Sequence, residues 1–184
     1  LVRDIQINAD PLKLETHHMI ILVKNLVGLK NLYKLISKGF LEYYRRYPRI
    51  PKSQLDKYRE GLIIGSACSA GELYSAILDN KSETEIEEIA SYYDYLEVQP
   101  IGNDQYLVAE GKLPDEEALR NINRRIVALG EKLNKPVAAT SDAHFINPED
   151  ELYRRILLAG LKFKDADKPT PIYMRTTDEM LEEF

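Results

Sequence analysis

The sequence predicts an α/β fold built from parallel βα units. Short apolar segments alternate at least four times with longer segments whose apolar residues recur every three or four positions. The short segments are typical of buried strands and the long ones of amphipathic helices, and their alternation favours a parallel sheet or barrel. The 184 residues leave room for one ordinary domain or one lobe of a larger one, and 44% hydrophobic and 30% charged residues are the balance of a globular chain.

The first two units occupy the N-terminal part of the chain. Residues 19–24 (MIILVK) and 61–66 (GLIIGS) are apolar, and we expect each to form a buried strand. Leucines at helical spacing predict a helix from the segment after the first strand to about Gly39. Residues 43–52 contain two prolines and four basic residues, so they predict an irregular connector, after which Ser53 is the expected N-cap of a short helix.

The rest of the chain continues the alternation. Ser82 and Glu85 form a capping box, as do Thr176 and Glu179, and each box predicts a helix start. A strong apolar stripe, from Leu119 to Leu133, predicts a long helix that begins at Asp115. The remaining expected elements are helices at 71–80 and 150–161, strands at 95–99 and 136–140, and a short strand at 106–108 within a loop.

Composition excludes several classes of protein. The net charge of −5 argues against a chain that binds nucleic acid strongly and without sequence preference by itself. One cysteine excludes a disulfide framework and favours a reducing, cytoplasmic setting. The longest apolar run, residues 19–23, is far shorter than a membrane span, and no signal peptide is recognisable. Because the sequence begins with Leu1, we expect a piece of a longer protein or a processed form.

Candidate metal ligands lie beside the expected strands. Asp142 and His144 follow the strand at 136–140, Cys68 follows the strand at 61–66, and His17 and His18 precede the first strand. Adjacent side chains of an extended segment point to opposite sides, so at most one of the two histidines enters a shared site. A mixed set of N, S and O donors suits Zn²⁺, Mn²⁺ or Fe²⁺ better than Ca²⁺ or Mg²⁺. The alternative interpretations are a turn aspartate, a buried cysteine and exposed polar histidines.

The connector at 43–52 carries a second candidate site. Its basic residues are interleaved with tyrosines, which resembles a patch that contacts nucleic-acid phosphates; they are Arg45, Arg46, Arg49 and Lys52. A solvated charge run is the alternative, since the chain as a whole is acidic. The sequence contains no Gly-rich phosphate loop and no G-x-S-x-G motif, so nucleotide-loop and serine-hydrolase functions lack support.

Several strings together resemble one family. They include HHMIILVKNLVGLKNLYKLIS, GLIIGSACSAGEL, KPVAATSDAHFINPEDELYRRILLAG and TTDEML. From about residue 17 to the C-terminus the chain resembles the PHP (polymerase and histidinol phosphatase) domain of the PolC-type alpha subunit of bacterial DNA polymerase III. The resemblance implies a distorted TIM-like barrel, phosphoester hydrolysis as the ancestral chemistry, and up to three divalent metal ions, with zinc or manganese expected. By position it implies metal ligands at His18, Cys68, Asp142 and His144.

The resemblance also implies an incomplete domain. The H-x-H motif that opens PHP domains does not occur in this sequence, so the chain resembles the part that follows the exonuclease insertion of PolC-type enzymes. We therefore expect a domain edge or linker at 1–16 and, at 17–184, a partial PHP domain truncated at both ends relative to the parent polymerase.

The expected function follows from that incompleteness. We expect a mainly structural, metal-binding piece of a replicative DNA polymerase with no catalytic residues of its own, silent when isolated. Its expected partners are the first PHP half, the exonuclease and polymerase domains, primer-template DNA and replisome subunits, with no membrane. The alternative is an active phosphoesterase or nuclease when the missing half completes the domain, and a stand-alone histidinol-phosphatase-like enzyme is a third and more distant one.

Overall fold

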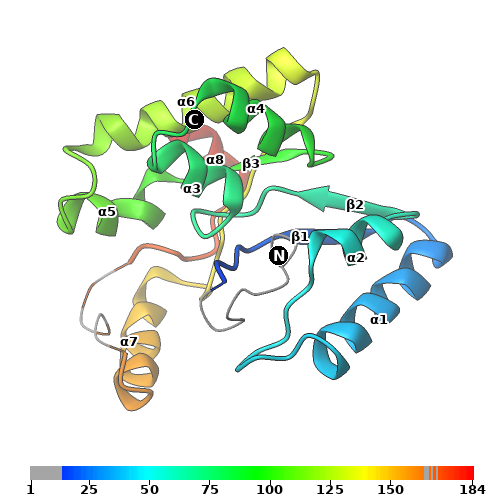
Figure 1. The fold of residues 1–184 in the computed structure, drawn as a ribbon. Coiled ribbons are helices and arrows are strands. Elements are labelled where there is room, and N and C mark those ends of the chain that lie inside the picture. The colour runs from blue at the N-terminus through cyan, green and yellow to red at the C-terminus, as the bar shows by residue number, and fades with distance from the viewer. Residues whose placement is uncertain (1–13, 164–165, 167, 169) are drawn as a thin grey trace. The chain divides into compact units, whose positions relative to one another are not determined.

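The computed structural model describes residues 14–163, 166, 168 and 170–184, so most of the expected linker at 1–16 lies outside the described residues. The fold is mixed α/β with two small sheets (Figure 1). In order, its elements are β1 (Ile20–Val23), α1 (Leu26–Leu41), α2 (Lys52–Lys57), β2 (Leu62–Gly65), α3 (Glu72–Leu78), α4 (Glu83–Ser91), β3 (Leu96–Val98), α5 (Gln105–Ala109), α6 (Glu116–Leu133), β4 (Val137–Ala139), α7 (Glu151–Gly160) and α8 (Thr177–Glu183). Two 3₁₀ turns, Ile101–Asp104 and Pro148–Asp150, precede α5 and α7.

The contacts divide the chain into two compact units. The first unit comprises the described residues up to Leu96 together with Lys132–Pro136. The second comprises Glu97–Glu131 and the described residues from Val137 to Phe184.

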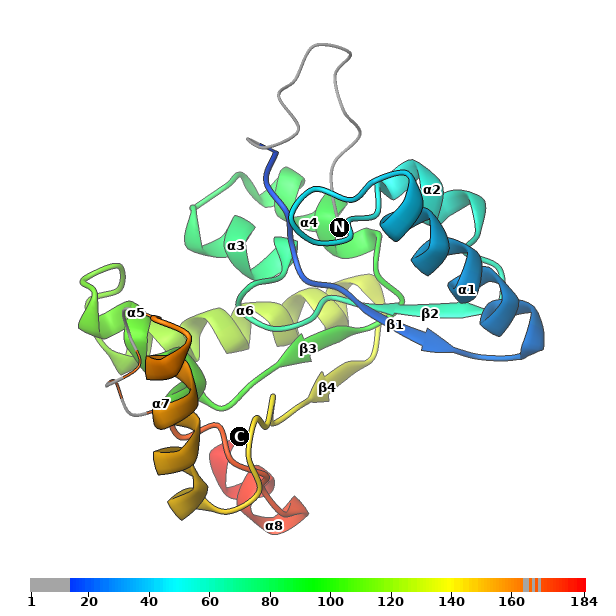
Figure 2. The same ribbon diagram turned by 90° about the horizontal axis from the view of Figure 1, so that it is seen from below.

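In the first unit, β1 and β2 run antiparallel, and for this pair the prediction of parallel βα units is wrong. Ile20 lies opposite Gly65 and Val23 opposite Leu62. The backbone N–H of Lys24, just after β1, donates to the carbonyl of Gly61, just before β2, at 2.9 Å. After β1, the chain passes through α1 and α2 and comes back to the C-terminal end of β1. From there β2 runs alongside β1 in the opposite direction (Figure 2).

The two strands differ in burial. β2 is buried at Leu62 and Ile64, as predicted. β1 is not, because Leu22 and Val23 are 47% and 41% exposed, so the prediction of a buried strand at 19–24 is wrong. Within the described part of the chain β1 pairs with β2 alone, which makes it an edge strand. An apolar run in the sequence cannot distinguish an edge strand from a central one.

β3 and β4 form the second sheet and run parallel, as predicted (Figure 2). Leu96 donates its N–H to the carbonyl of Pro136 at 2.9 Å, and Thr140 donates to Val98 at 3.0 Å, so both strands advance in the same direction.

The short strand expected at 106–108 is a helical turn instead. This segment lies in α5, where Glu110 donates its N–H to the carbonyl of Tyr106 at 2.9 Å and Leu107 is buried. The helical turn continues directly from the 3₁₀ turn at Ile101–Asp104. Burial of Leu107 within the folded unit therefore outweighs the local β-propensity of these residues.

Two helix starts follow their predicted caps, and a third does not. The N–H of Glu85 donates to the Ser82 hydroxyl at 3.3 Å, and the Glu85 carboxylate accepts from the Ser82 N–H at 3.1 Å. Thr176 and Glu179 form the same reciprocal box before α8. Ser53 is not an N-cap, because α2 begins at Lys52 behind Pro51 and the Pro51 carbonyl accepts the first helical hydrogen bond.

Each unit has an apolar core of its own. In the first unit the most deeply buried side chains come from α1, α2, β2 and α4, and they include Leu35, Leu55, Ile64 and Ile86. In the second, the predicted stripe of α6 is buried at Leu119, Ile122, Ile126 and Leu129.

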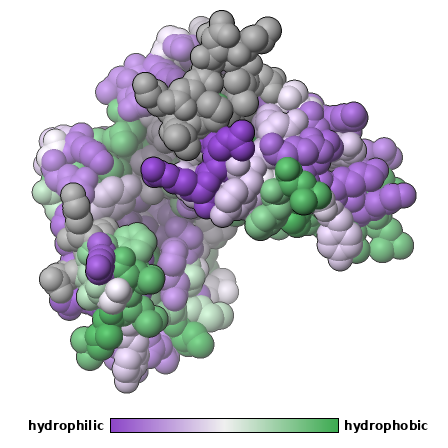
Figure 3. Space-filling view, turned by 60° about the horizontal axis from the view of Figure 1, so that its bottom comes forward, coloured by the Kyte–Doolittle hydropathy of each residue, from purple (hydrophilic) through white to green (hydrophobic). Residues whose placement is uncertain are grey.

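The helix α7 contributes no residue to the core of the second unit, to which it belongs. None of its residues is buried, and hydrophobic side chains gather over it (Figure 3). The exposed apolar side chains in and just after α7 are Leu152, Tyr153, Ile156, Leu157, Leu161 and Phe163. Across the residues that the structure describes, no helix has the length and apolar character needed to span a membrane.

Candidate metal centre

His18 and Cys68 come together in the first unit. His18 lies just before β1 and Cys68 just after β2, and the imidazole Nδ1 is 3.8 Å from the thiol Sγ. The backbone fixes this approach, because the N–H of His18 donates to the carbonyl of Ala70 at 2.9 Å and His18 forms a parallel bridge with Gly71. The segment that enters β1 is thereby paired with the loop that leaves β2.

The loop at 66–71 has a tightly constrained backbone. Ala67 has φ of +61°, a left-handed conformation that is uncommon for residues other than glycine. The Gly71 N–H donates to the carbonyl of Cys68 at 2.7 Å. A Cβ at Gly71 would lie 2.2 Å from the carbonyl oxygen of Ser66, so only glycine fits there without a shift. The loop therefore holds Cys68 in place through backbone interactions.

The spacing of the two donors fits a shared metal ion. Zinc binds thiolate at about 2.3 Å and imidazole nitrogen at about 2.0 to 2.1 Å, so two ligands at a tetrahedral angle lie about 3.6 Å apart. The observed 3.8 Å between Nδ1 and Sγ is close to that value. His18 is exposed and Cys68 is half-buried, which leaves both donors accessible.

Asp142 and His144 form a second pair, in the second unit. They follow β4, and His144 Nδ1 lies 2.8 Å from the backbone carbonyl oxygen of Asp142. Because a carbonyl oxygen only accepts, a hydrogen bond at this distance places the proton on Nδ1. The unprotonated Nε2 is then the ring atom that can ligate a metal. The N–H of His144 also donates to the carbonyl of Ile172 at 2.8 Å. Asp142 itself has φ of +49°, a conformation that Asp adopts more readily than most residues.

Buried polar side chains support the turn that leads to Asp142. The Thr140 hydroxyl donates to the Glu97 carboxylate at 3.0 Å and accepts from the Gln99 amide at 2.9 Å. The Asn103 amide donates to the carbonyl of Ser141 at 2.9 Å. These buried polar side chains were not predicted from the sequence, because Glu97 and Gln99 look like ordinary strand residues. The one signal in the sequence was Glu97, a carboxylate within a segment expected to be a strand.

The four predicted ligands thus appear as two pairs. Among residues 14–163, 166, 168 and 170–184, no group of three or more His, Cys, Asp or Glu side chains is positioned to hold one metal ion. The expectation that His18, Cys68, Asp142 and His144 share one end of a barrel stays a prediction.

The predicted phosphate patch divides into residues with different surroundings. Arg45 and Arg46 are exposed in a tight turn, where Arg45 donates its N–H to the carbonyl of Tyr47 at 3.1 Å. Lys52 lies elsewhere, with its ammonium 2.7 Å from a carboxylate oxygen of Glu72, whose side chain is only 3% exposed. The role of the four basic residues in binding nucleic acid stays a prediction.

Lys52 also packs on an aromatic ring. Its ammonium lies 4.7 Å from the centroid of the Tyr92 ring, and the Arg59 guanidinium lies 4.9 Å from the same centroid. The Tyr92 hydroxyl donates to the Asp56 carboxylate at 2.8 Å. Burial, followed by that hydrogen bond, raises the pKa of Tyr92 above its usual value, so the hydroxyl keeps its proton. Lys52 is therefore one member of an extended polar cluster.

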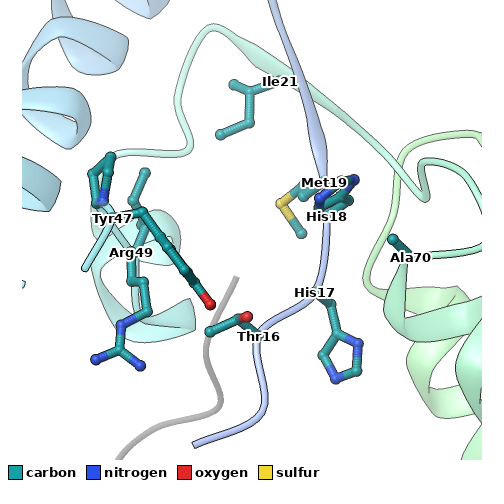
Figure 4. Close-up of a pocket in the computed structure, with 10 residues that line it drawn as sticks. Thr16, His17, His18, Met19, Ile21, Tyr47, Arg49 and Ala70 are labelled. Carbon is teal, nitrogen blue, oxygen red and sulfur yellow. The ribbon is translucent and has the colours of Figure 1, made fainter. Parts of the chain in front are cut away.

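A pocket of about 400 Å³ joins the two candidate sites within the first unit. Tyr47 and Arg49 of the connector line one side, and His17 and His18 line the other (Figure 4). The sequence could not show this neighbourhood, because the connector and the segment before β1 are far apart along the chain. An arginine and a candidate metal ligand across one pocket are groups that suit a phosphate.

Comparisons with known proteins identify the family. The sequence model of the PHP domain matches residues 4–101, which is more than half of the chain. The chain belongs to the PHP domain family. The matched range contains His18 and Cys68, and the resemblance predicted from sequence is confirmed.

Curated relatives extend the match along the chain. The chain is similar to the PolC-type DNA polymerase III of Clostridium perfringens, with 56% identity over 177 residues, which are 96% of the chain and 12% of the relative. It is 53% identical over 176 residues to that of Caldanaerobacter subterraneus, covering 96% of the chain and 13% of the relative. For Bacillus subtilis the identity is 49% over 171 residues, 91% of the chain and 12% of the relative. The chain thus spans about an eighth of these relatives' length.

Proposed function

We propose that this chain is part of the alpha subunit of a PolC-type DNA polymerase III and serves there as a metal-binding, mainly structural module. The identity of 56% over 177 residues to the Clostridium perfringens protein carries this proposal. At this coverage the match spans both apolar cores, the helix caps and the loops that carry the candidate metal ligands. Synthesis of DNA would then be the work of other parts of the polymerase.

The arrangement of donors favours a structural role over catalysis by this chain alone. A hydrolytic metal needs several fixed ligands and an open position for water or substrate. His18 with Cys68, and Asp142 with His144, would each contribute two ligands to zinc or manganese, and other parts of the polymerase would supply the rest. Bound metal would cross-link the loops that carry these residues, and up to three ions would occupy the completed barrel.

A chimera tests the proposal directly. The matching 171-residue segment of the Bacillus subtilis polymerase is replaced by this chain, and primer extension is measured. We expect the chimera to extend primers at a rate close to that of the parent, while deletion of the segment abolishes extension. A folded chimera without primer extension would contradict the proposal.

Metal content provides a readout that does not depend on activity. We expect His18→Gln or Cys68→Ser to lower the bound zinc or manganese of the chimera, measured by elemental analysis. His17→Gln is the matched control, because it changes the neighbouring imidazole and should leave the metal content unchanged. Equal metal loss in the His17 and His18 variants would remove His18 from the ligand set.

A phosphoesterase is the second candidate function, favoured by the pocket that Arg49 and His18 both line from opposite sides (Figure 4). In that case Arg49 would bind the phosphate and orient it toward the metal site. We expect the isolated chain to leave bis(p-nitrophenyl) phosphate intact in the presence of Mn²⁺, and any activity to require the complete domain. Turnover by the isolated chain that Asp142→Asn abolishes would favour the phosphoesterase instead.

The proposal also names partners and a location. The partners are the first PHP half, the exonuclease and polymerase domains of the same chain, primer-template DNA and replisome subunits. The proposed setting is the cytoplasm, in line with a sequence whose one cysteine cannot form a disulfide within the chain.

A further inference from the structure

A row of lysines follows one face of α1. Lys30, Lys34 and Lys38 are spaced four residues apart, so their side chains lie on the same side of the helix. With a rise of 1.5 Å per residue, successive members of the row are about 6 Å apart along the axis. The buried residues Gly28, Asn31, Leu35 and Gly39 lie on another side of the helix, and Lys30 and Lys34 are exposed.

The lysine row borders a groove with two tyrosines. The groove has a volume of about 510 Å³ and is lined by Lys30, Tyr33, Lys34, Ser37, Lys38 and Tyr58. No carboxylate belongs to this lining, although the chain as a whole carries a net charge of −5. The ring of Tyr33 is 61% exposed at the surface of the groove. The groove thus combines cationic side chains with an accessible aromatic face.

The lysines are held in different ways. Both carboxylate oxygens of Glu42 accept from the Lys38 ammonium, at 2.7 and 2.8 Å, so Lys38 is largely neutralised. The Lys34 ammonium lies 5.3 Å from the Tyr58 ring centroid, a cation–π contact that orients the charge without cancelling it. The positive potential of the groove is therefore concentrated at Lys30 and Lys34.

We propose that this groove binds single-stranded nucleic acid, with Lys30 and Lys34 on successive phosphates and Tyr33 stacked on a base. Sites for single strands combine a cationic groove that follows the backbone with aromatic rings on which bases stack. The exposed Tyr33 and two lysines line the same groove and supply both components. Duplex DNA, an anionic membrane or an acidic peptide would use the lysines but leave the Tyr33 ring without a stacking partner.

The inference does not rest on the proposed function. It depends on the residues of α1 and on Tyr58, and it is tested by binding alone, whereas the proposed function is tested by primer extension. A failed binding test therefore leaves the proposed function standing, and a failed primer-extension test leaves the groove standing.

Fluorescence anisotropy of a labelled oligothymidine of about twelve nucleotides tests the site in this chain. Two phosphate contacts to a single strand predict a slope of about −1.4 for log K against log salt concentration. We expect Lys30→Gln/Lys34→Gln to flatten that slope to near zero. Tyr33→Leu should weaken binding about ten-fold at fixed salt, while Tyr33→Phe should retain the affinity, because stacking needs the ring and not the hydroxyl.

The matched control is Arg120→Gln/Arg124→Gln on α6, which removes two cations at the same spacing from another exposed helix face. It should leave the affinity and the slope unchanged. The proposal is overturned if oligothymidine does not bind at low salt, or if the α1 and α6 variants lose equal affinity. It is also overturned if duplex DNA, anionic vesicles or poly-glutamate bind as tightly as the oligothymidine.

Discussion

Replacing Lys52, the first residue of α2, by methionine should destabilise the first unit strongly, although the sequence predicts Lys52 to be part of a basic connector that resembles a surface patch. The change leaves the Glu72 carboxylate, which is 3% exposed, without its cation at 2.7 Å. Breaking a fully buried ion pair costs about 3 to 5 kcal/mol. The Lys52 side chain is 21% exposed, so solvent screens the pair and the expected loss of unfolding free energy is about 2 kcal/mol.

Urea denaturation followed by circular dichroism measures this loss. The double variant Lys52→Met/Glu72→Gln should recover most of it, because the buried charge is then removed together with its partner. Lys112→Met is the matched control, since it breaks an exposed ion pair to Glu110 at 3.1 Å and should cost about 0.5 kcal/mol or less. If the Lys52→Met variant is no less stable than Lys112→Met, the reasoning is refuted. Lys52 would then be a candidate for phosphate binding rather than for stability.

Three further predictions concern other parts of the chain. Ser82→Ala removes the hydroxyl of the α4 capping box and should lower the unfolding free energy by about 1 kcal/mol in the same denaturation assay, with Ser82→Asp close to the parent. Gly71→Ala should displace the Cys68 loop, because the added Cβ meets the Ser66 carbonyl at 2.2 Å, and zinc affinity measured by calorimetry should fall. Arg45→Gln/Arg46→Gln should reduce the salt dependence of primer-template binding by the chimera; an unchanged slope would identify these arginines as solvated charges.

Elements determined by nearby residues were predicted well. The capping box at Ser82 and Glu85 needs only two residues three positions apart, and it forms as expected. The stripe of α6 repeats one apolar spacing over 18 residues, so the buried face from Leu119 to Leu129 follows from helix geometry alone. In the candidate metal centre, His18 Nδ1 lies 3.8 Å from Cys68 Sγ, and the role of both residues as metal ligands stays a prediction.

Features determined by distant residues were not predicted. The direction of β2 depends on where α1 and α2 return the chain, and the exposure of β1 depends on which strands flank it; neither is encoded in the strand residues themselves. Likewise, the ion pair of Lys52 requires Glu72, a residue that lies beyond β2. The neighbourhood of Arg49 and His18 is equally non-local.

The backbone of the Cys68 loop has a consequence for the order in which the metal centre is assembled. The bridge from His18 to Gly71 and the left-handed turn at Ala67 are features of the backbone, so main-chain geometry holds the two donors at their spacing. In zinc fingers, by contrast, binding and folding are one event and chelators denature the protein. Here backbone hydrogen bonds hold the loop, so we expect a chelator to strip the loop of metal reversibly, and one divalent ion to replace another without unfolding of the chain.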